Sequence, residues 1–175
     1  MSLHVIVGCM FSGKSTELLR LGRRYALAGK KVLYINHKTD VRYRALAVTT
    51  HDGLYNTAMS CERLSEINDE VTGFEVVLID ESQFFPDVEV MCETWANSGK
   101  VVIAAALSGT CRRQPFENVT KLMAAADTIQ HLKAVCHCGS DASFTHRKTP
   151  LPADGSFVGG ADDYEALCRR CFNET

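Results

Sequence analysis

The sequence lacks an excess of charge of either sign, and it lacks any long apolar run. Its formal net charge is -2 and its pI is about 6.3, so it offers no basic surface for a polyanion, and nucleic acid is disfavoured as a partner. No apolar run approaches the length of about 18 residues that a membrane-spanning helix needs. A strand is expected to begin within three residues of Met1, which leaves no space for an export signal. These absences predict a cytoplasmic protein, without a membrane partner, that binds a small ligand.

The chain does contain short apolar runs that alternate with segments of helical periodicity. Runs of about five residues rich in Val and Ile are typical of strands buried on both faces of a parallel sheet. We predict such strands in LHVIV, KVLYI, EVVLID and KVVIAAA, a further strand in TIQHLKAV, and helices over residues 15–28, 61–71, 86–98 and 117–126. The buried stripe of the first helix is predicted to contain Leu18, Leu21, Tyr25 and Ala28, with Gly29 at its end. This alternation favours an α/β fold with a parallel sheet flanked by helices.

The segment GCMFSGKS, residues 8–15, follows the first predicted strand and opens the first predicted helix. Gly8 and Gly13 let backbone N–H groups turn toward phosphate oxygens, and the positive end of the helix points to the same place. Lys14 can reach the β- and γ-phosphates, and the Ser15 hydroxyl can ligate Mg2+. The segment therefore predicts a P-loop that binds a nucleoside triphosphate.

A second motif, IDESQFFPD, follows the strand EVVLID and supplies two adjacent carboxylates. Asp80 is in the position of the acidic residue that holds Mg2+ opposite a phosphate loop. Glu81 beside it can accept a proton, either from water, as in an ATPase, or from a substrate hydroxyl, as in a kinase. The spacing alone leaves these two reactions open.

The sequence contains neither an Asn-Lys-x-Asp motif nor an Asp-x-x-Gly segment after Asp80, so a signalling GTPase is disfavoured. The polar segment TDVRYR follows the second predicted strand, at the edge of the sheet where ligands bind in such folds. Arg42 in this segment could stabilise charge on a transferring phosphoryl group, although a solvated run of charges is the more ordinary interpretation of this segment alone.

Eight cysteines divide into four isolated residues and two close pairs near the C-terminus. Two pairs of this kind are typical of a structural zinc site in which thiolates close a loop. The pair in CRRC has the usual spacing, whereas the pair in CHC has one intervening residue, so His137 is an alternative ligand to Cys138. The predicted zinc ligands are Cys136, Cys138, Cys168 and Cys171. We predict a nucleotide-binding unit in residues 1–134 and a small zinc-binding subdomain in residues 135–175.

In combination, these motifs resemble the thymidine kinases of animal cells, many bacteria and poxviruses. The resemblance covers nearly the whole chain and rests on an ordered set of segments: GCMFSGKSTELLR, KTDVRYR, THDG, IDESQFFPD, VVIAAALSGTCRRQPF, LKAVC, VGGADDY and CRRC. It implies a P-loop fold with a zinc-bearing lasso subdomain. It also implies transfer of the γ-phosphoryl group of ATP to the 5′-hydroxyl of thymidine, with Glu81 as the base. Family members are commonly tetramers that dTTP inhibits, so a homotetramer and this feedback inhibitor are expected.

The resemblance also implies roles for individual residues. The nucleotide and phosphate contacts that it implies are Gly8, Cys9, Met10, Phe11, Ser12, Gly13, Lys14, Ser15, Asp40, Val41, Arg42, Asp80, Glu81, Ser82 and Gln83. The side chains that it places at the nucleoside base are Met10, Phe84, Leu107, Phe116, Thr145 and Tyr164. The backbone that it places at the thymine edge belongs to Gly155, Ser156, Phe157, Val158 and Gly159.

Three positions depart from the family pattern. Cys111 replaces an aromatic residue beside the sugar or base, Ser82 replaces a small residue after the glutamate, and the CHC pair is one residue short. The first departure motivates an alternative hypothesis, a kinase of broader or different nucleoside specificity. A third hypothesis is a zinc-containing ATP-binding module that acts with a partner protein.

Overall fold

The computed structural model describes residues 1–39, 57–150, 159–160 and 162–175. Its larger part is a six-stranded sheet in the order β3-β2-β4-β5-β1-β6, in which each neighbouring pair is parallel. The strands are β1 Ser2–Gly8, β2 Val32–His37, β3 Thr57–Cys61, β4 Val76–Ile79, β5 Val101–Leu107 and β6 Thr128–Leu132. The predicted parallel α/β fold is confirmed.

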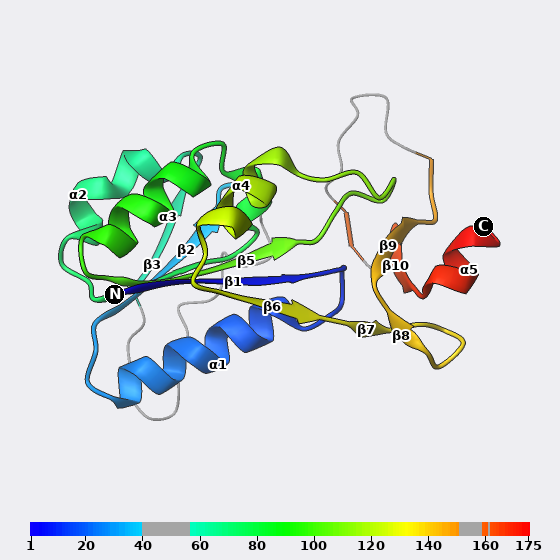
Figure 1. Cartoon of the computed structure of the whole chain (residues 1–175), viewed down its shortest axis with the longest axis horizontal. Coiled ribbons are helices and arrows are strands. Elements are labelled where there is room, and N and C mark those ends of the chain that lie inside the picture. Colours follow the sequence, from blue (N-terminus) through cyan, green and yellow to red (C-terminus); the bar gives the residue numbers. More distant parts are fainter. Residues whose placement is uncertain (40–56, 151–158, 161) are drawn as a thin grey trace.

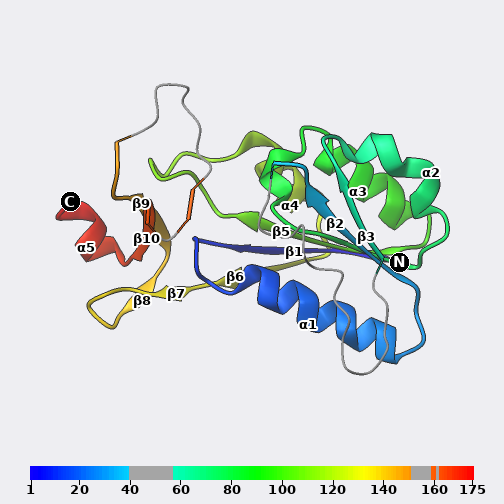
Figure 2. The same ribbon diagram turned by 180° about the vertical axis from the view of Figure 1, so that it is seen from behind.

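Helices cover both faces of this sheet (Figure 1). Among the helices of the described residues, α1 lies on one face and α2, α3 and α4 lie on the other, as the reverse view also shows (Figure 2). The helices are α1 Lys14–Leu27, α2 Asn68–Val71, α3 Val88–Asn97 and α4 Glu117–Ala125, with short 3-10 helices η2 Leu64–Ile67 and η3 Ser82–Phe84. Among the helices of the described residues, none is long and apolar enough to cross a membrane.

The core follows from the alternation of side chains along each buried strand. In β1, Val5 and Val7 join the cluster beneath α3 and α4, whereas Ile6 joins the cluster beneath α1. Leu18 and Leu78 complete the α1 side, and both are fully buried. Both faces of the central strands are therefore apolar, which explains why these strands are continuous apolar runs in the sequence.

Two predictions about the elements differ from the structure. The helix predicted over 61–71 is shorter, because Cys61 ends the unpredicted strand β3 and the chain becomes helical at Leu64. The carboxylate of Asp87 accepts hydrogen bonds from the backbone N–H groups of Leu64 (3.1 Å) and Ser65 (3.0 Å), so a distant residue sets this start. Ala28, predicted to be buried, is exposed because α1 ends at Leu27.

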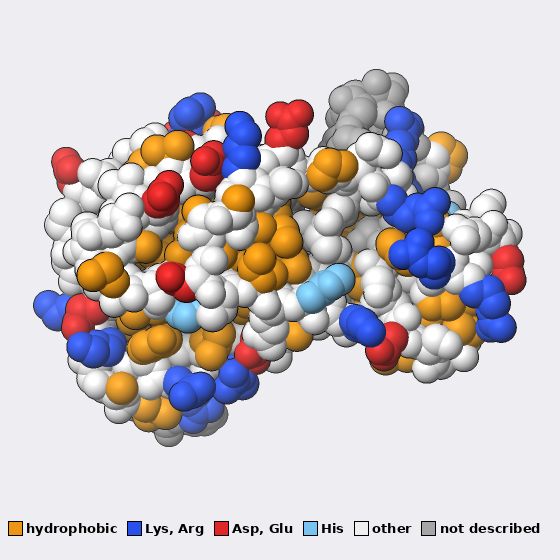
Figure 3. Space-filling model, viewed as in Figure 1, with side chains coloured by type: hydrophobic (Ala, Val, Ile, Leu, Met, Phe, Trp, Pro, Cys, Tyr) orange, Lys and Arg blue, Asp and Glu red, His pale blue; other side chains and the backbone are white. Residues whose placement is uncertain are grey.

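The C-terminal part forms a smaller unit at the carboxyl end of the strands (Figures 1 and 2). Two antiparallel pairs, β7 with β8 and β9 with β10, precede the last helix. The elements are β7 Ala134–Val135, β8 Asp141–Ala142, β9 Phe144–Arg147, β10 Tyr164–Leu167 and α5 Arg169–Asn173. The space-filling view shows this unit as the smaller of two lobes, with charges of both signs interspersed on the visible face (Figure 3).

Truncating Leu18 tests the packing of α1 on the sheet. Leu18→Ala should lower the free energy of unfolding by about 2–5 kcal/mol, because a fully buried side chain leaves a cavity. Leu27→Ala is the matched control on the same helix, where the side chain is 65% exposed, and should cost about 0.5 kcal/mol or less. Urea unfolding followed by circular dichroism measures both. Equal losses in the two variants would contradict this account of the core.

Candidate active site

The loop after β1 winds tightly around the side chain of Lys14. Phe11 and Gly13 have positive φ angles of 65° and 83°, which turns the loop back toward the start of α1. The Lys14 ammonium donates a 2.8 Å hydrogen bond to the carbonyl of Cys9, and Lys14 is buried. A Cβ on Gly8 would lie 2.6 Å from the carbonyl oxygen of Leu132, so close approach to β6 requires glycine there. The loop therefore has a defined conformation that presents Lys14 at the N-terminus of a helix.

Asp80 follows β4 and is buried opposite this loop, with 1% of its surface exposed. Its carboxylate accepts hydrogen bonds from the Tyr34 hydroxyl (3.0 Å), from the backbone N–H of Glu81 (2.9 Å) and from the side chain of Ser15. Burial raises the pKa of Asp80, whereas these hydrogen bonds lower it. The two residues predicted to hold Mg2+, Ser15 and Asp80, are thus in direct contact, and their oxygens are the kind of ligand that Mg2+ prefers.

Glu81 has an uncommon backbone conformation for a residue with a side chain, with φ 47° and ψ 43°. Its carboxylate accepts a 2.5 Å hydrogen bond from the amide of Gln83. The other end of that amide accepts a hydrogen bond from the backbone N–H of Leu107 (3.1 Å), at the end of β5. Gln83 is buried, and both ends of its amide are engaged within the protein.

A cleft of about 370 Å³ brings the predicted groups together. Lys14, Ser15, Glu81 and Leu107 line it, along with Met10, Phe11, Gly13 and Thr16. A phosphate-binding loop and a carboxylate that can accept a proton therefore share one cavity, next to a residue that the family resemblance places at the nucleoside base. The hydroxyl of an acceptor in this cleft would lie between the Glu81 carboxylate and the phosphates.

Other residues predicted at the nucleoside base lie where the two lobes meet. The Thr145 hydroxyl, on β9, accepts a 3.0 Å hydrogen bond from the backbone N–H of Met10. Tyr164 is buried on β10, and its hydroxyl accepts a hydrogen bond from Arg147 (2.5 Å). Burial raises the pKa of Tyr164, whereas the neighbouring Arg147 guanidinium lowers it. Cys111 is partly buried.

Two aromatic residues and one glycine complete the described part of this set. The Phe84 ring packs on His37 with ring centres 5.7 Å apart. Phe116 is partly buried against the core beneath α3 and α4. A Cβ on Gly159 would lie 2.9 Å from the Tyr164 ring. The remaining predicted contacts lie outside the described residues: Asp40, Val41, Arg42, Gly155, Ser156, Phe157 and Val158.

The four paired cysteines converge in the smaller lobe. The sulfur atoms of Cys136, Cys138, Cys168 and Cys171 all lie within 4.8 Å of one another. Those of Cys138 and Cys168 are 3.7 Å apart, which is too long for a disulfide and close to the edge, about 3.8 Å, of a tetrahedron with Zn–S bonds of about 2.3 Å. The cluster could hold zinc. The shortened CHC pair brings both of its sulfurs into the cluster, whereas His137 is directed to Glu165, with Nδ1 3.8 Å from Oε2.

Comparison with known proteins identifies the family. A model of the thymidine kinase family matches residues 1–172. The chain belongs to the thymidine kinase family. The thymidine kinase of rabbit fibroma virus (strain Kasza) is 43% identical over 171 residues, which cover 97% of this chain and 95% of the viral protein. That of vaccinia virus (strain Western Reserve) is 42% identical over 171 residues, covering 97% of this chain and 96% of the viral protein.

The flagellar accessory protein FlaH from Methanocaldococcus jannaschii shares the fold at 14% identity. The match has a TM-score of 0.55 and covers 85% of this chain and 73% of FlaH. Membership of the thymidine kinase family confirms the resemblance stated from the sequence. It makes the chain an ATP-dependent thymidine kinase, and the P-loop fold implies use of ATP and Mg2+.

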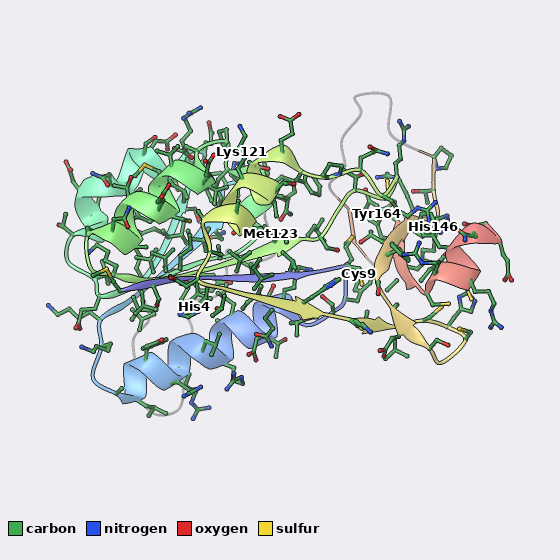
Figure 4. All side chains as sticks on the ribbon, viewed as in Figure 1. His4, Cys9, Lys121, Met123, His146 and Tyr164 are labelled. Carbon is green, nitrogen blue, oxygen red and sulfur yellow. The ribbon has the colours of Figure 1, made fainter. Side chains whose placement is uncertain are left out.

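Sequence analysis missed Tyr34 and Asn118, and it missed the contact of Cys9 with the smaller lobe, although the resemblance names Cys9 among the nucleotide contacts. Tyr34 hydrogen-bonds to Asp80, and its position within the apolar run KVLYI was the available signal, since a buried tyrosine hydroxyl needs a partner. The Cys9 thiol donates to the carbonyl of Ala142 (3.3 Å) and joins the core of the smaller lobe (Figure 4). The side chain of Asn118 holds the turn after Glu81, and no pattern in the sequence indicated this contact.

Asp80→Asn should separate stability from activity. Because burial raises the pKa of this carboxyl, its ionised form is less favourable in the fold than in the unfolded chain. We therefore compare the unfolding free energies of the wild type and Asp80→Asn without nucleotide and Mg2+. The wild type should lose stability relative to the variant as the pH rises from about 4, the pKa of this carboxyl in the unfolded chain, through its raised pKa in the folded protein. Phosphoryl transfer by the variant should fall about a hundredfold or more, because the carboxylate predicted to hold Mg2+ is lost.

Urea titrations without added nucleotide or Mg2+ at several pH values, with a coupled kinase assay alongside, measure these effects. A stability difference between the wild type and Asp80→Asn that is the same at pH 4 and pH 8 would contradict the assigned cost of burying this carboxylate.

Proposed function

We propose that Glu81 is the general base of this kinase, accepting the proton of the thymidine 5′-hydroxyl as its oxygen attacks the γ-phosphorus of ATP. The bond from that phosphorus to the bridging oxygen breaks, and the products are dTMP and ADP. One observation carries this assignment: Glu81 lines the same cleft as Lys14 and Ser15. From this position the Glu81 carboxylate would lie within reach of a hydroxyl held beside the phosphates, as proton transfer requires.

The other groups of the site hold the donor. In this proposal, Lys14 and the backbone of residues 8–15 bind the β- and γ-phosphates, and Ser15 and Asp80 hold Mg2+, which would neutralise charge on the phosphates. Arg42 would stabilise the transferring phosphoryl group. The remaining proposed nucleotide contacts are Asp40, Val41, Ser82 and Gln83.

The acceptor would bind between the lobes. We assign the walls of its base pocket to Met10, Phe84, Leu107, Cys111, Phe116, Thr145 and Tyr164, and its thymine edge to the backbone of residues 155–159. The hydrogen bond between the Met10 backbone and Thr145, which joins the phosphate loop to the smaller lobe, supports this location. Because Cys111 is smaller than the aromatic side chain it replaces, the pocket could accept nucleosides other than thymidine, and this is the second candidate function.

Glu81→Gln should lower kcat with ATP, Mg2+ and thymidine by about 10²- to 10⁴-fold, because the amide cannot accept the proton. The KM for thymidine should change little, since the substitution preserves size and the pocket. Initial rates of dTMP formation measure both constants. Wild-type turnover in the variant would remove Glu81 from its role.

Competition among nucleosides distinguishes the two candidate functions. In the wild type, thymidine should have a higher kcat/KM than deoxyuridine or deoxycytidine if the family specificity holds. A preference for another nucleoside would favour the second candidate, and ATP turnover that is indifferent to every nucleoside would favour an ATP-binding module instead.

We further propose that the four clustered thiolates bind one structural Zn2+. Cys138→Ser should lower the zinc content well below one ion per chain, because a hydroxyl is a poor substitute for a thiolate in a tetrahedral sulfur site. His137→Ala is the matched control from the adjacent position and should keep its zinc. Elemental analysis of purified protein measures both. Loss of zinc in His137→Ala with retention in Cys138→Ser would assign the fourth ligand to the histidine.

We also propose a homotetramer and inhibition by dTTP, which the family resemblance implies, and a cytoplasmic location, which the sequence composition favours. The exposed edge strand β6, where Ile129 is 48% exposed, is compatible with assembly. We propose a division into units 1–134 and 135–175, because the pattern of the sequence changes near residue 134 and the cysteine pairs follow it. Sedimentation analysis, inhibition assays, localisation of the tagged protein and limited proteolysis test these four statements in turn.

A further inference from the structure

The turn that carries Glu81 needs support from outside itself. Glu81 has a left-handed backbone conformation, which residues with a side chain rarely adopt without compensating contacts. Within the turn, the backbone N–H of Phe84 donates to the carbonyl of Glu81 (3.0 Å), and that of Phe85 donates to the carbonyl of Ser82 (3.2 Å). These two bonds shape the turn, but they do not attach it to the rest of the fold.

Asn118 makes that attachment from the first turn of α4. Its side-chain amide nitrogen donates to the carbonyl oxygens of Gln83 (3.0 Å) and Phe85 (2.9 Å), and its amide oxygen accepts from the backbone N–H of Val119 (3.0 Å). Both amide hydrogens are therefore used to hold one turn that lies more than 30 residues earlier in the chain. Because each atom of the amide has a partner, the side chain has one defined orientation.

Gln83 connects this attachment to the reacting carboxylate. The side-chain amide of Gln83 donates to Glu81 and accepts from the backbone N–H of Leu107. The backbone carbonyl of Gln83 accepts from the Asn118 side chain. The position of the Gln83 side chain thus depends on two anchors, the end of β5 and α4. Without the anchor from α4, the Gln83 backbone could shift, and the carboxylate of Glu81 would shift with it.

We propose that Asn118 is a positioning residue for the reaction: it holds the turn Glu81–Phe85 so that the Glu81 carboxylate points into the cleft. This inference rests on the proposed role of Glu81 as the base. Asn118 touches neither substrate nor phosphate in the proposed geometry. A displacement of about 1 Å in a reacting group can cost about a hundredfold in rate, so a residue of this kind affects turnover rather than binding.

Asn118→Ala should lower kcat by about ten- to a hundredfold and leave the KM values for ATP and thymidine within about twofold. Asn118→Asp is the second variant, because it keeps the size of the side chain but has no amide hydrogens for the two carbonyls; it should show the same loss of kcat. Thr120→Ala is the control, since Thr120 is exposed on the same helix and its hydroxyl bonds only within α4 and its cap, to the carbonyl of Phe116. Its kcat should match the wild type.

A double-mutant cycle with Glu81→Gln distinguishes positioning from a general structural role. Single-turnover rates with enzyme in excess should fall in Asn118→Ala but show no further fall when Asn118→Ala is added to Glu81→Gln, because no base remains to be misplaced. The same fold-loss in both backgrounds, or a loss of kcat matched by a rise in KM, would overturn the proposal. Wild-type rates in Glu81→Gln alone would instead refute the role of Glu81, and the role of Asn118 would fail with it.

Discussion

The carboxylate of Asp80, buried at the end of β4, is the constraint on which the rest of the site depends. A buried carboxylate is stable only if hydrogen bonds or a cation compensate for lost hydration. Here the donors come from three directions: Ser15 at the start of α1, Tyr34 on β2 and the backbone of Glu81. Satisfying this one group therefore fixes the phosphate loop, a neighbouring strand and the turn of the proposed base relative to each other. Mg2+ would complete the compensation when nucleotide binds.

A second set of contacts connects the phosphate loop of the larger lobe to the smaller lobe. The thiol of Cys9 and the backbone N–H of Met10 bond to Ala142 and Thr145 of the smaller lobe. Burial raises the pKa of Cys9, so this thiol stays protonated and acts as a donor rather than as a reactive thiolate. The loop that holds the donor phosphates is thereby attached to the unit that carries the cysteine cluster and Tyr164, so order in the smaller lobe and geometry at the phosphates are linked.

Where the sequence failed to predict an element, the missing information lay in a distant residue or an exposed edge. Among the described strands, β3, Thr57–Cys61, pairs only with β2, at the edge of the sheet, and its sequence carries no continuous apolar run that would predict a strand. The helix after it begins where Asp87 caps Leu64 and Ser65, more than 20 residues away. Asn118 belongs to the same class, because its partners Gln83 and Phe85 are neighbours only in the folded chain.

The sequence by itself determined the succession of the central strands and helices along the chain, the phosphate loop, the paired carboxylates and the family. Those features depend on local periodicity or on residues a few positions apart, so they can be recognised directly in the linear sequence. Only the tertiary structure decided that Ser15 contacts Asp80, that Cys138 rather than His137 joins the other three thiols, and that Gln83 and Asn118 support Glu81. Apart from the bond between Gln83 and Glu81, these contacts join segments that are remote in sequence. Burial favours them because polar groups in the interior need a partner.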